Sequence, residues 1–122
     1  LDKYSDNERF YFVNQIPYDW VLDKVYGIVH HGGSGTTHSG VKYGCVSLIF
    51  PHIIDQYVWN EVISSRVLGP KGISLKDITL EKIKLLLYDM YENPVYLQNV
   101  KSVSNKMLYE DFDNELNEFI MK

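Results

Sequence analysis

The sequence predicts an α/β domain in which helices flank a mainly parallel sheet. Three stretches, residues 9–13, 26–29 and 46–51, are rich in the β-branched and aromatic residues typical of strands. Helical patterns alternate with these stretches, which favours parallel strands joined by right-handed crossovers. Three strands are few for a complete doubly wound sheet, so we expect the chain to form the second half of one.

The chain is long enough for one domain with a hydrophobic core, because it has 122 residues of which 45% are apolar. It begins at Leu1 rather than at a methionine, so we expect it to belong to a longer protein. Residues 1–8 are polar, and we interpret them as a linker or a truncated start. The domain itself is expected over residues 9–122.

The first half of the chain contains two expected strands and two expected helices. Residues 9–13 (RFYFV) are aromatic and predict a strand, which Pro17 ends. Residues 18–24 have room for about two turns of helix. Residues 26–29 predict a short buried strand before a glycine-rich turn, from which a helix runs to Gly44.

The second half continues the alternation. Residues 46–51 are apolar on both faces, which is typical of a strand buried in a parallel sheet. A helix is expected over residues 56–68, and another begins at Thr79 and ends before Pro94. Residues 95–122 predict a long amphipathic helix or a broken pair of helices, so the chain ends in a helical tail.

Three side chains are expected in the interior. Trp20 and Trp59 lie at helical positions that favour the core. Cys45 is the single cysteine, which excludes an internal disulfide and fits a reducing compartment, so we expect a cytoplasmic protein, free or peripheral to a membrane. There is no run of about 18 apolar residues, so we expect no transmembrane segment in this piece.

Charge and histidine spacing argue against two other classes of site. The net charge is −4 and there is no basic stripe, so we expect no nucleic-acid partner. The four histidines at positions 30, 31, 38 and 52 are irregularly spaced, and neighbours on a strand point to opposite faces. We therefore expect no zinc site.

The stretch HHGGSGTT, residues 30–37, lies between an expected strand and an expected helix. Its small residues let a ligand approach the backbone closely, and the free amides and dipole of a helix N-terminus favour an anion. Ser34, Thr36 and Thr37 add hydroxyl groups, and His31 can donate to a phosphate oxygen. The stretch therefore predicts a site for a phosphate or diphosphate group.

Two other phosphate-binding loops are excluded. After Gly33 and Gly35, His38 stands where a dinucleotide fingerprint needs its third glycine, and no Gly-Lys-Ser/Thr sequence closes a P-loop. A glycine-rich turn without a ligand remains the alternative. Because side chains alternate along a strand, we expect His30 to face away from His31 and to matter little for a ligand.

A second polar loop follows the strand at residues 46–51. It carries Asp55 and Gln56, and Asp55 is also a candidate N-cap for the following helix. Because ligands bind beyond the carboxyl ends of the strands in such sheets, we expect this loop and HHGGSGTT to form one site.

Three separated elements carry a resemblance to a known family: IPYDW at residues 16–20, HHGGSGTT, and P-x-x-x-DQ at residues 51–56. Residues 13–69 resemble the donor-binding segment of nucleotide-sugar glycosyltransferases with two Rossmann-like domains, the GT-B architecture. Within that group the chain looks most like sterol glucosyltransferases and bacterial enzymes that glycosylate lipids and antibiotic aglycones. The resemblance implies the second half of a Rossmann-like parallel sheet with flanking helices and a helical C-terminal tail.

The resemblance also implies roles for individual residues. His31 and the loop from Gly33 to Thr37 would hold the donor diphosphate, Asp55 and Gln56 would bind hydroxyls of the sugar, and Ile16 with Val13 would line the nucleobase. The implied donor-binding residues are Val13, Ile16, His31, Gly33, Ser34, Gly35, Thr36, Thr37, Asp55 and Gln56.

The activity implied is that of an inverting hexosyltransferase. It would move a hexose from a nucleoside-diphosphate sugar, a UDP-sugar or dTDP-sugar, to a hydroxyl of a lipid, sterol or other small aglycone, with no metal or other cofactor. The family takes its catalytic base from the N-terminal domain, so we expect no catalytic residue in this chain and no activity from it alone. Two alternatives stay open: a non-catalytic nucleotide-sugar-binding subunit that acts with a separate acceptor-domain partner, and a structural fragment without affinity.

Overall fold

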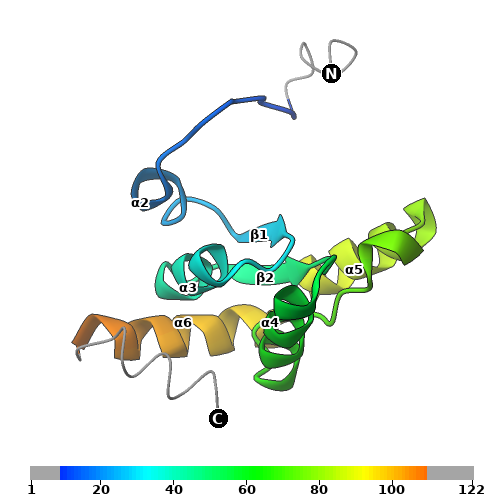
Figure 1. Ribbon diagram of the computed structural model, residues 1–122. Coiled ribbons are helices and arrows are strands. Elements are labelled where there is room, and N and C mark those ends of the chain that lie inside the picture. The colour runs from blue at the N-terminus through cyan, green and yellow to red at the C-terminus, as the bar shows by residue number, and fades with distance from the viewer. Residues whose placement is uncertain (1–8, 110–122) are drawn as a thin grey trace.

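The computed structural model describes residues 9–109, with the side chains of residues 9–107, as an α/β arrangement (Figure 1). This confirms the predicted fold class. The elements in chain order are α2 (Tyr18–Val21), β1 (Gly27–His30), α3 (Ser34–Lys42), β2 (Val46–Ile49), α4 (Ile54–Ser65), the 3-10 helix η1 (Leu75–Asp77), α5 (Leu80–Glu92) and α6 (Pro94–Tyr109).

The sheet consists of β1 and β2, which pair in parallel with Gly27 opposite Val46 and His30 opposite Ile49. Both strands therefore end at the same edge. As predicted, β2 is buried along its whole length, because α3, α4, α5 and α6 all contact it. β1 is more open, and the side chain of Val29 is 51% exposed.

The hydrophobic core gathers around β2. It contains Val41, Val46, Leu48, Ile49, Phe50, Trp59, Ile63, Leu68, Met90, Val100, Val103 and Met107. The core position predicted for Trp59 is confirmed. A buried side-chain amide, that of Asn60, exchanges two hydrogen bonds of 2.9 and 3.0 Å with the backbone of Gly72, which packs against the Ile49 carbonyl. The Asn60 side chain thus holds the backbone at Gly72 against the end of β2.

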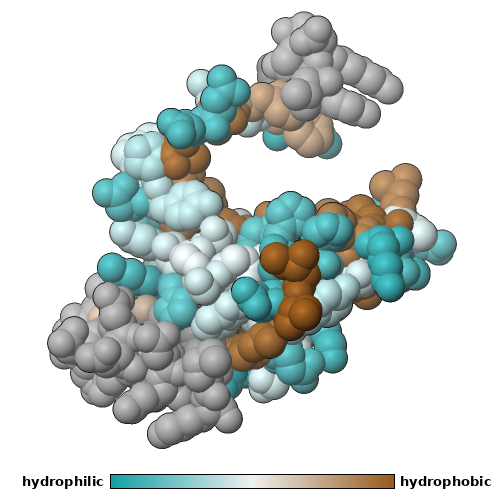
Figure 2. Space-filling view, in the orientation of Figure 1, coloured by the Kyte–Doolittle hydropathy of each residue, from teal (hydrophilic) through white to brown (hydrophobic). Residues whose placement is uncertain are grey.

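The strand predicted at residues 9–13 is wrong. This stretch has no strand geometry, its apolar side chains are about half exposed or more, and it runs away from the body of the molecule (Figures 1 and 2). Aromatic residues favour a strand only where a neighbouring strand can accept their backbone hydrogen bonds. Within residues 9–109, β1 and β2 pair with each other and the stretch has no such neighbour.

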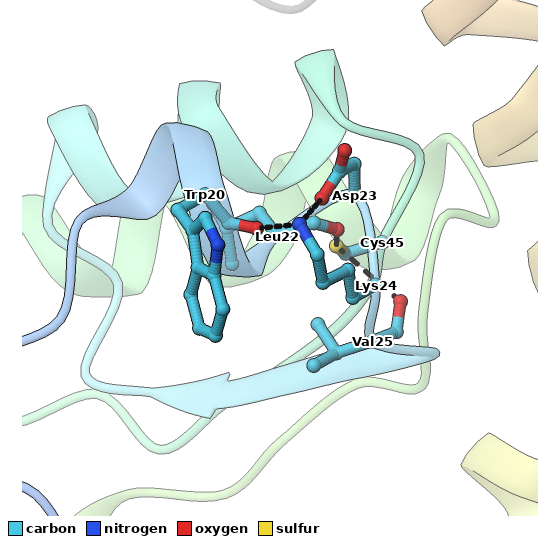
Figure 3. Close-up of polar contacts among 6 residues, drawn as sticks. All are labelled: Trp20, Leu22, Asp23, Lys24, Val25 and Cys45. Atoms are coloured by element: carbon cyan, nitrogen blue, oxygen red, sulfur yellow. Dashed lines mark hydrogen bonds and ion pairs between the residues drawn. The ribbon is translucent and has the colours of Figure 1, made fainter.

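The short helix α2 packs through its C-terminal side. It ends at Val21, earlier than expected, and Trp20 is 57% exposed, so its predicted core position is wrong. Lys24 lies over the Trp20 ring, donates to the Trp20 carbonyl and pairs with Asp23 at 3.0 Å (Figure 3). Cys45 is fully buried as predicted, and its thiol donates to the Leu22 carbonyl at 3.0 Å. Burial raises the pKa of this thiol.

The remaining helices lie close to their predicted ranges. Helix α4 begins at Ile54 with Ile53 as its N-cap, so the N-cap role predicted for Asp55 is wrong, and Asp55 lies in the first turn. Thr79 caps α5 as predicted, because its side chain accepts the Lys82 N–H at 3.2 Å. The tail predicted at residues 95–122 is helical as far as Tyr109, and its remainder lies outside the described residues, as does the linker predicted at residues 1–8. Among the described helices, none combines the length and apolarity needed to cross a membrane.

Candidate functional site

The structure brings the two predicted loops together at the edge where β1 and β2 end. The contact is made by Gly32, which has a φ of +98°. A Cβ at this position would lie 2.8 Å from Cγ2 of Ile49 and 3.1 Å from the carbonyl oxygen of Gln56. Only glycine fits this backbone conformation and this close approach. The first loop therefore rests directly on the first turn of α4.

The N-terminus of α3 presents free backbone amides at this edge. Its N-cap is Gly33, which offers no side-chain acceptor, and the first intrahelical bond runs from the Thr37 N–H to the Gly33 carbonyl at 2.9 Å. The amides of Ser34, Gly35 and Thr36 are consequently without helix acceptors. The first turn carries no acidic residue, so the positive end of the helix dipole is not neutralised there.

The space beside these amides is open. An added Cβ at Gly33 or at Gly35 would meet no heavy atom within 4 Å, and neither residue has a positive φ. Neither backbone conformation nor packing therefore requires glycine at these two positions. Both positions leave the backbone at the start of α3 accessible from outside.

The three predicted hydroxyl groups of the loop have different surroundings. Ser34 is exposed, and the Thr36 hydroxyl lies 3.3 Å from the hydroxyl of Tyr18, which joins α2 to the first turn of α3. Thr37 is fully buried, and its hydroxyl donates to the Gly33 carbonyl at 2.7 Å. The structure therefore brings Ser34 and Thr36 to the loop surface and places Thr37 beneath it.

The two adjacent histidines have different surroundings: His30 is the last residue of β1, and His31 follows the strand. His31 is exposed and has no hydrogen bond or ion pair to any other described residue. His30 is half-buried; its Nδ1 accepts the Gly32 N–H at 3.1 Å, and its Nε2 lies 3.4 Å from Oγ of Ser47. Burial, with a smaller contribution from His31, lowers the pKa of His30 to about 4. The sequence analysis did not predict the hydrogen bond from the Gly32 N–H to the His30 ring. The available signal was the spacing, because a side chain can accept the N–H of the residue two positions later.

The second loop is organised by the amide of Gln56. Its Oε1 accepts the N–H groups of His52 at 2.7 Å and Ile53 at 3.1 Å. The oxygen of this amide is thus used within the protein, and its NH2 group has no hydrogen-bond acceptor among the described residues. Asp55 is exposed in the same turn, with no hydrogen bond or ion pair to another described residue.

The segment before α2 lines a pocket of about 700 Å³, formed by residues 13–18. Val13 is 49% exposed and Ile16 is partly buried. Because Tyr18 closes this segment and contacts Thr36, the pocket adjoins the first turn of α3. Space-filling atoms show the segment standing off the body with a wide opening beneath it (Figure 2).

A metal centre has no support from the part of the chain that the structure describes. In that part no three or more His, Cys, Asp or Glu side chains come together as a possible metal site. His38, one of the four histidines, instead lies edge-on to Trp59 with ring centroids 5.1 Å apart, and its Nδ1 donates to the Ser34 carbonyl at 2.7 Å.

Comparison with known proteins identifies the family of the chain. Residues 3–121 match the family described as erythromycin biosynthesis protein CIII-like, C-terminal domain. The chain is 34% identical over 91 residues to the sterol 3-beta-glucosyltransferase UGT80B1 of Arabidopsis thaliana, and 32% identical over 101 residues to UGT80A2 of the same plant. These matches cover 75% and 83% of the chain. It is also 36% identical over 80 residues, 66% of its length, to the enfumafungin synthase efuA of Hormonema carpetanum.

The chain spans only 15%, 16% and 6% of the lengths of these three relatives. Two of these three relatives are named glucosyltransferases, and the family match covers nearly the whole chain. Both findings confirm the resemblance to the C-terminal part of GT-B glycosyltransferases. The chain belongs to the family of the erythromycin biosynthesis protein CIII-like C-terminal domain.

Proposed function

We propose that this chain is the donor-binding part of an inverting glycosyltransferase that moves a hexose from a UDP-sugar to a hydroxyl of a sterol, lipid or other small aglycone. The observation that carries the proposal is the N-terminus of α3, where three amides have no helix acceptors and the space beside Gly33 and Gly35 is open. Two curated relatives are named sterol 3-beta-glucosyltransferases, which supports the acceptor class.

The diphosphate occupies the surface of the first loop in this proposal. The amides of Gly33, Ser34, Gly35 and Thr36 and the exposed side chain of His31 supply donors to its oxygens. Its negative charge is stabilised by the dipole of α3, which has nine residues and no acidic residue in its first turn. Because these donors are fixed in place, the loop needs no metal ion or other cofactor to hold the leaving diphosphate.

The sugar and the nucleobase lie on either side of the diphosphate. Gln56 donates through its free NH2 group to a sugar hydroxyl, and Asp55 accepts from one, since a carboxylate and an amide suit a polyol. The nucleobase lies against Ile16 and Val13 in the pocket of residues 13–18. The base that deprotonates the acceptor comes from an N-terminal domain, and the loop stabilises the departing diphosphate as the acceptor oxygen displaces it.

A buried free thiol at Cys45 supports a cytoplasmic location.

Calorimetric titration of the 122-residue chain with uridine, UDP and UDP-glucose tests the proposal. We expect UDP to bind at least about tenfold more tightly than uridine, because the diphosphate adds charge-assisted hydrogen bonds of about 1.5–3 kcal/mol each. Equal affinities for UDP and uridine would contradict the diphosphate site. Glucose transfer by the full-length protein to a sterol, lost when the chain is supplied alone, tests the acceptor assignment and separates an enzyme from a binding subunit.

A further inference from the structure

The imidazole of His30 holds the turn between β1 and α3 from inside. Its Nδ1 accepts the Gly32 N–H at 3.1 Å, and its Nε2 lies 3.4 Å from Oγ of the fully buried Ser47 on β2. The ring therefore bridges the neighbouring strand and the backbone of the glycine-rich loop.

These contacts specify one protonation state. A backbone amide can only donate, so Nδ1 must carry a lone pair, and the single proton of the neutral ring is then on Nε2, directed at Ser47. A proton on Nδ1 would face the Gly32 N–H and remove this hydrogen bond. The lowered pKa of His30, caused mainly by burial, keeps the ring neutral at neutral pH.

The hydrogen bond fixes a peptide plane that the proposed diphosphate site depends on. The peptide group between His31 and Gly32 is planar, so anchoring its N–H also sets the direction in which the chain leaves His31. The same glycine is pressed against Ile49 and the backbone of Gln56, which leaves the turn little room to rearrange. His31 directly precedes Gly32 in the chain, and the first amides of α3 directly follow it, so the position of Gly32 determines where both lie.

We propose that neutral His30 is a positioning residue for diphosphate binding: through Nδ1 it fixes the His31–Gly32 peptide, and thereby sets His31 and the amides of α3 in their binding arrangement. The inference rests on the proposed function. It replaces the expectation that His30, facing away from His31, matters little for the ligand.

Three substitutions separate the two contacts of the ring. His30→Asn places Oδ1 near the position of Nδ1, where an asparagine accepts an N–H two residues on, but loses Ser47. His30→Gln reaches towards Ser47 and leaves Gly32 without its acceptor, and His30→Phe keeps the ring shape without either hydrogen bond. The readouts are the histidine tautomer by long-range ¹H–¹⁵N NMR, hydrogen exchange of the Gly32 amide, UDP affinity and melting temperature, all on the 122-residue chain.

We expect wild-type His30 to be protonated on Nε2 only, and the Gly32 amide to exchange slowly in wild type and His30→Asn. The Asn variant should keep UDP affinity within about threefold of wild type, whereas the Gln and Phe variants should lose about tenfold or more. A purely structural role would instead make affinity follow melting temperature across all three variants, which would overturn the proposal, as would a proton on Nδ1 or an Asn variant as weak as Phe. A wild-type chain with this tautomer and a slow Gly32 amide that binds no UDP would refute the proposed function, and the diphosphate role of His30 with it.

Discussion

Gly35→Ala should move stability and ligand binding in opposite directions. The added Cβ meets no heavy atom within 4 Å, so the fold accommodates it without rearrangement. Alanine has less backbone freedom to lose than glycine in a helix, and we expect a gain of about 0.5 kcal/mol at this first-turn position. For a domain of this size that corresponds to a melting temperature raised by about 2 °C.

The same methyl group should weaken UDP binding. It enters the open space beside the amides of α3, where the proposed diphosphate lies, and displacing a phosphate oxygen from one amide costs about 1.5–3 kcal/mol, or about tenfold to a hundredfold in Kd. Differential scanning fluorimetry gives the melting temperature and calorimetry gives the Kd. Ser102→Ala is the matched control, because Ser102 is exposed on α6 and its replacement gains helix propensity away from the loop. If Gly35→Ala bound UDP as tightly as wild type while raising the melting temperature, the open space would not be the phosphate site.

Four further predictions follow from the described side chains. Asp55→Ala and Gln56→Ala should each lower the affinity for UDP-glucose by about 1–3 kcal/mol more than that for UDP; an equal loss for both ligands, by calorimetry, would remove the sugar role. His31→Ala should weaken UDP binding by about 1.5–3 kcal/mol and leave the melting temperature nearly unchanged, since the side chain is exposed; an unchanged Kd would contradict its phosphate contact. Folding lowers the pKa of His30 from 6.5 to about 4, so the unfolded chain binds more protons below pH 6.5. The free energy of unfolding should therefore fall by up to about 3 kcal/mol as the pH is lowered from 6.5 to 4 in urea titrations. His30→Asn should reduce this dependence on pH. The 122-residue chain alone should bind UDP weakly and transfer no glucose from radiolabelled UDP-glucose to a sterol, so any glycosylated product would be evidence against a base in another domain.

Local sequence patterns correctly predicted the buried strand β2 and the start of helix α3. The apolar run ending at Ile49 became a buried strand, and the glycine-rich turn opened a helix at Ser34, because burial and helix starts are encoded in neighbouring residues. Residues 9–13 also have residue types that favour a strand, but no strand lies beside them among the described residues. The local sequence pattern does not show whether a neighbouring strand is present to pair with them. The core position predicted for Trp20 was wrong for a different reason: helical spacing indicates a face, but α2 has only four residues and buries none of them.

The sequence predicted that two polar loops lie at one edge of the sheet, but it did not predict the contacts of His30 and Thr37 beneath the first loop. That two polar loops share one edge follows from parallel strands, and the contact between Gly32 and Gln56 shows the loops in place. The inward bond of His30 depends on which tautomer a buried pocket selects, and the burial of Thr37 depends on how α3 packs. The spacing from His30 to Gly32 permits that bond, but the burial of the His30 ring and of Thr37 comes from elements farther along the chain, which residue spacing does not show.

The glycines of the loop divide into one that the fold requires and two that it does not, and this division bears on how the site works. Gly32 has a positive φ, lies close to Ile49 and donates its N–H to the His30 ring, so several contacts constrain the turn. Gly33 and Gly35 keep their outer side empty, so the rigid amides stay accessible. A loop that is constrained from inside and open outside orders few groups on binding, so in the proposed site its amide donors would need little rearrangement to bind the diphosphate. In the proposed function such an arrangement suits the leaving diphosphate, whose negative charge grows as its bond to the sugar breaks.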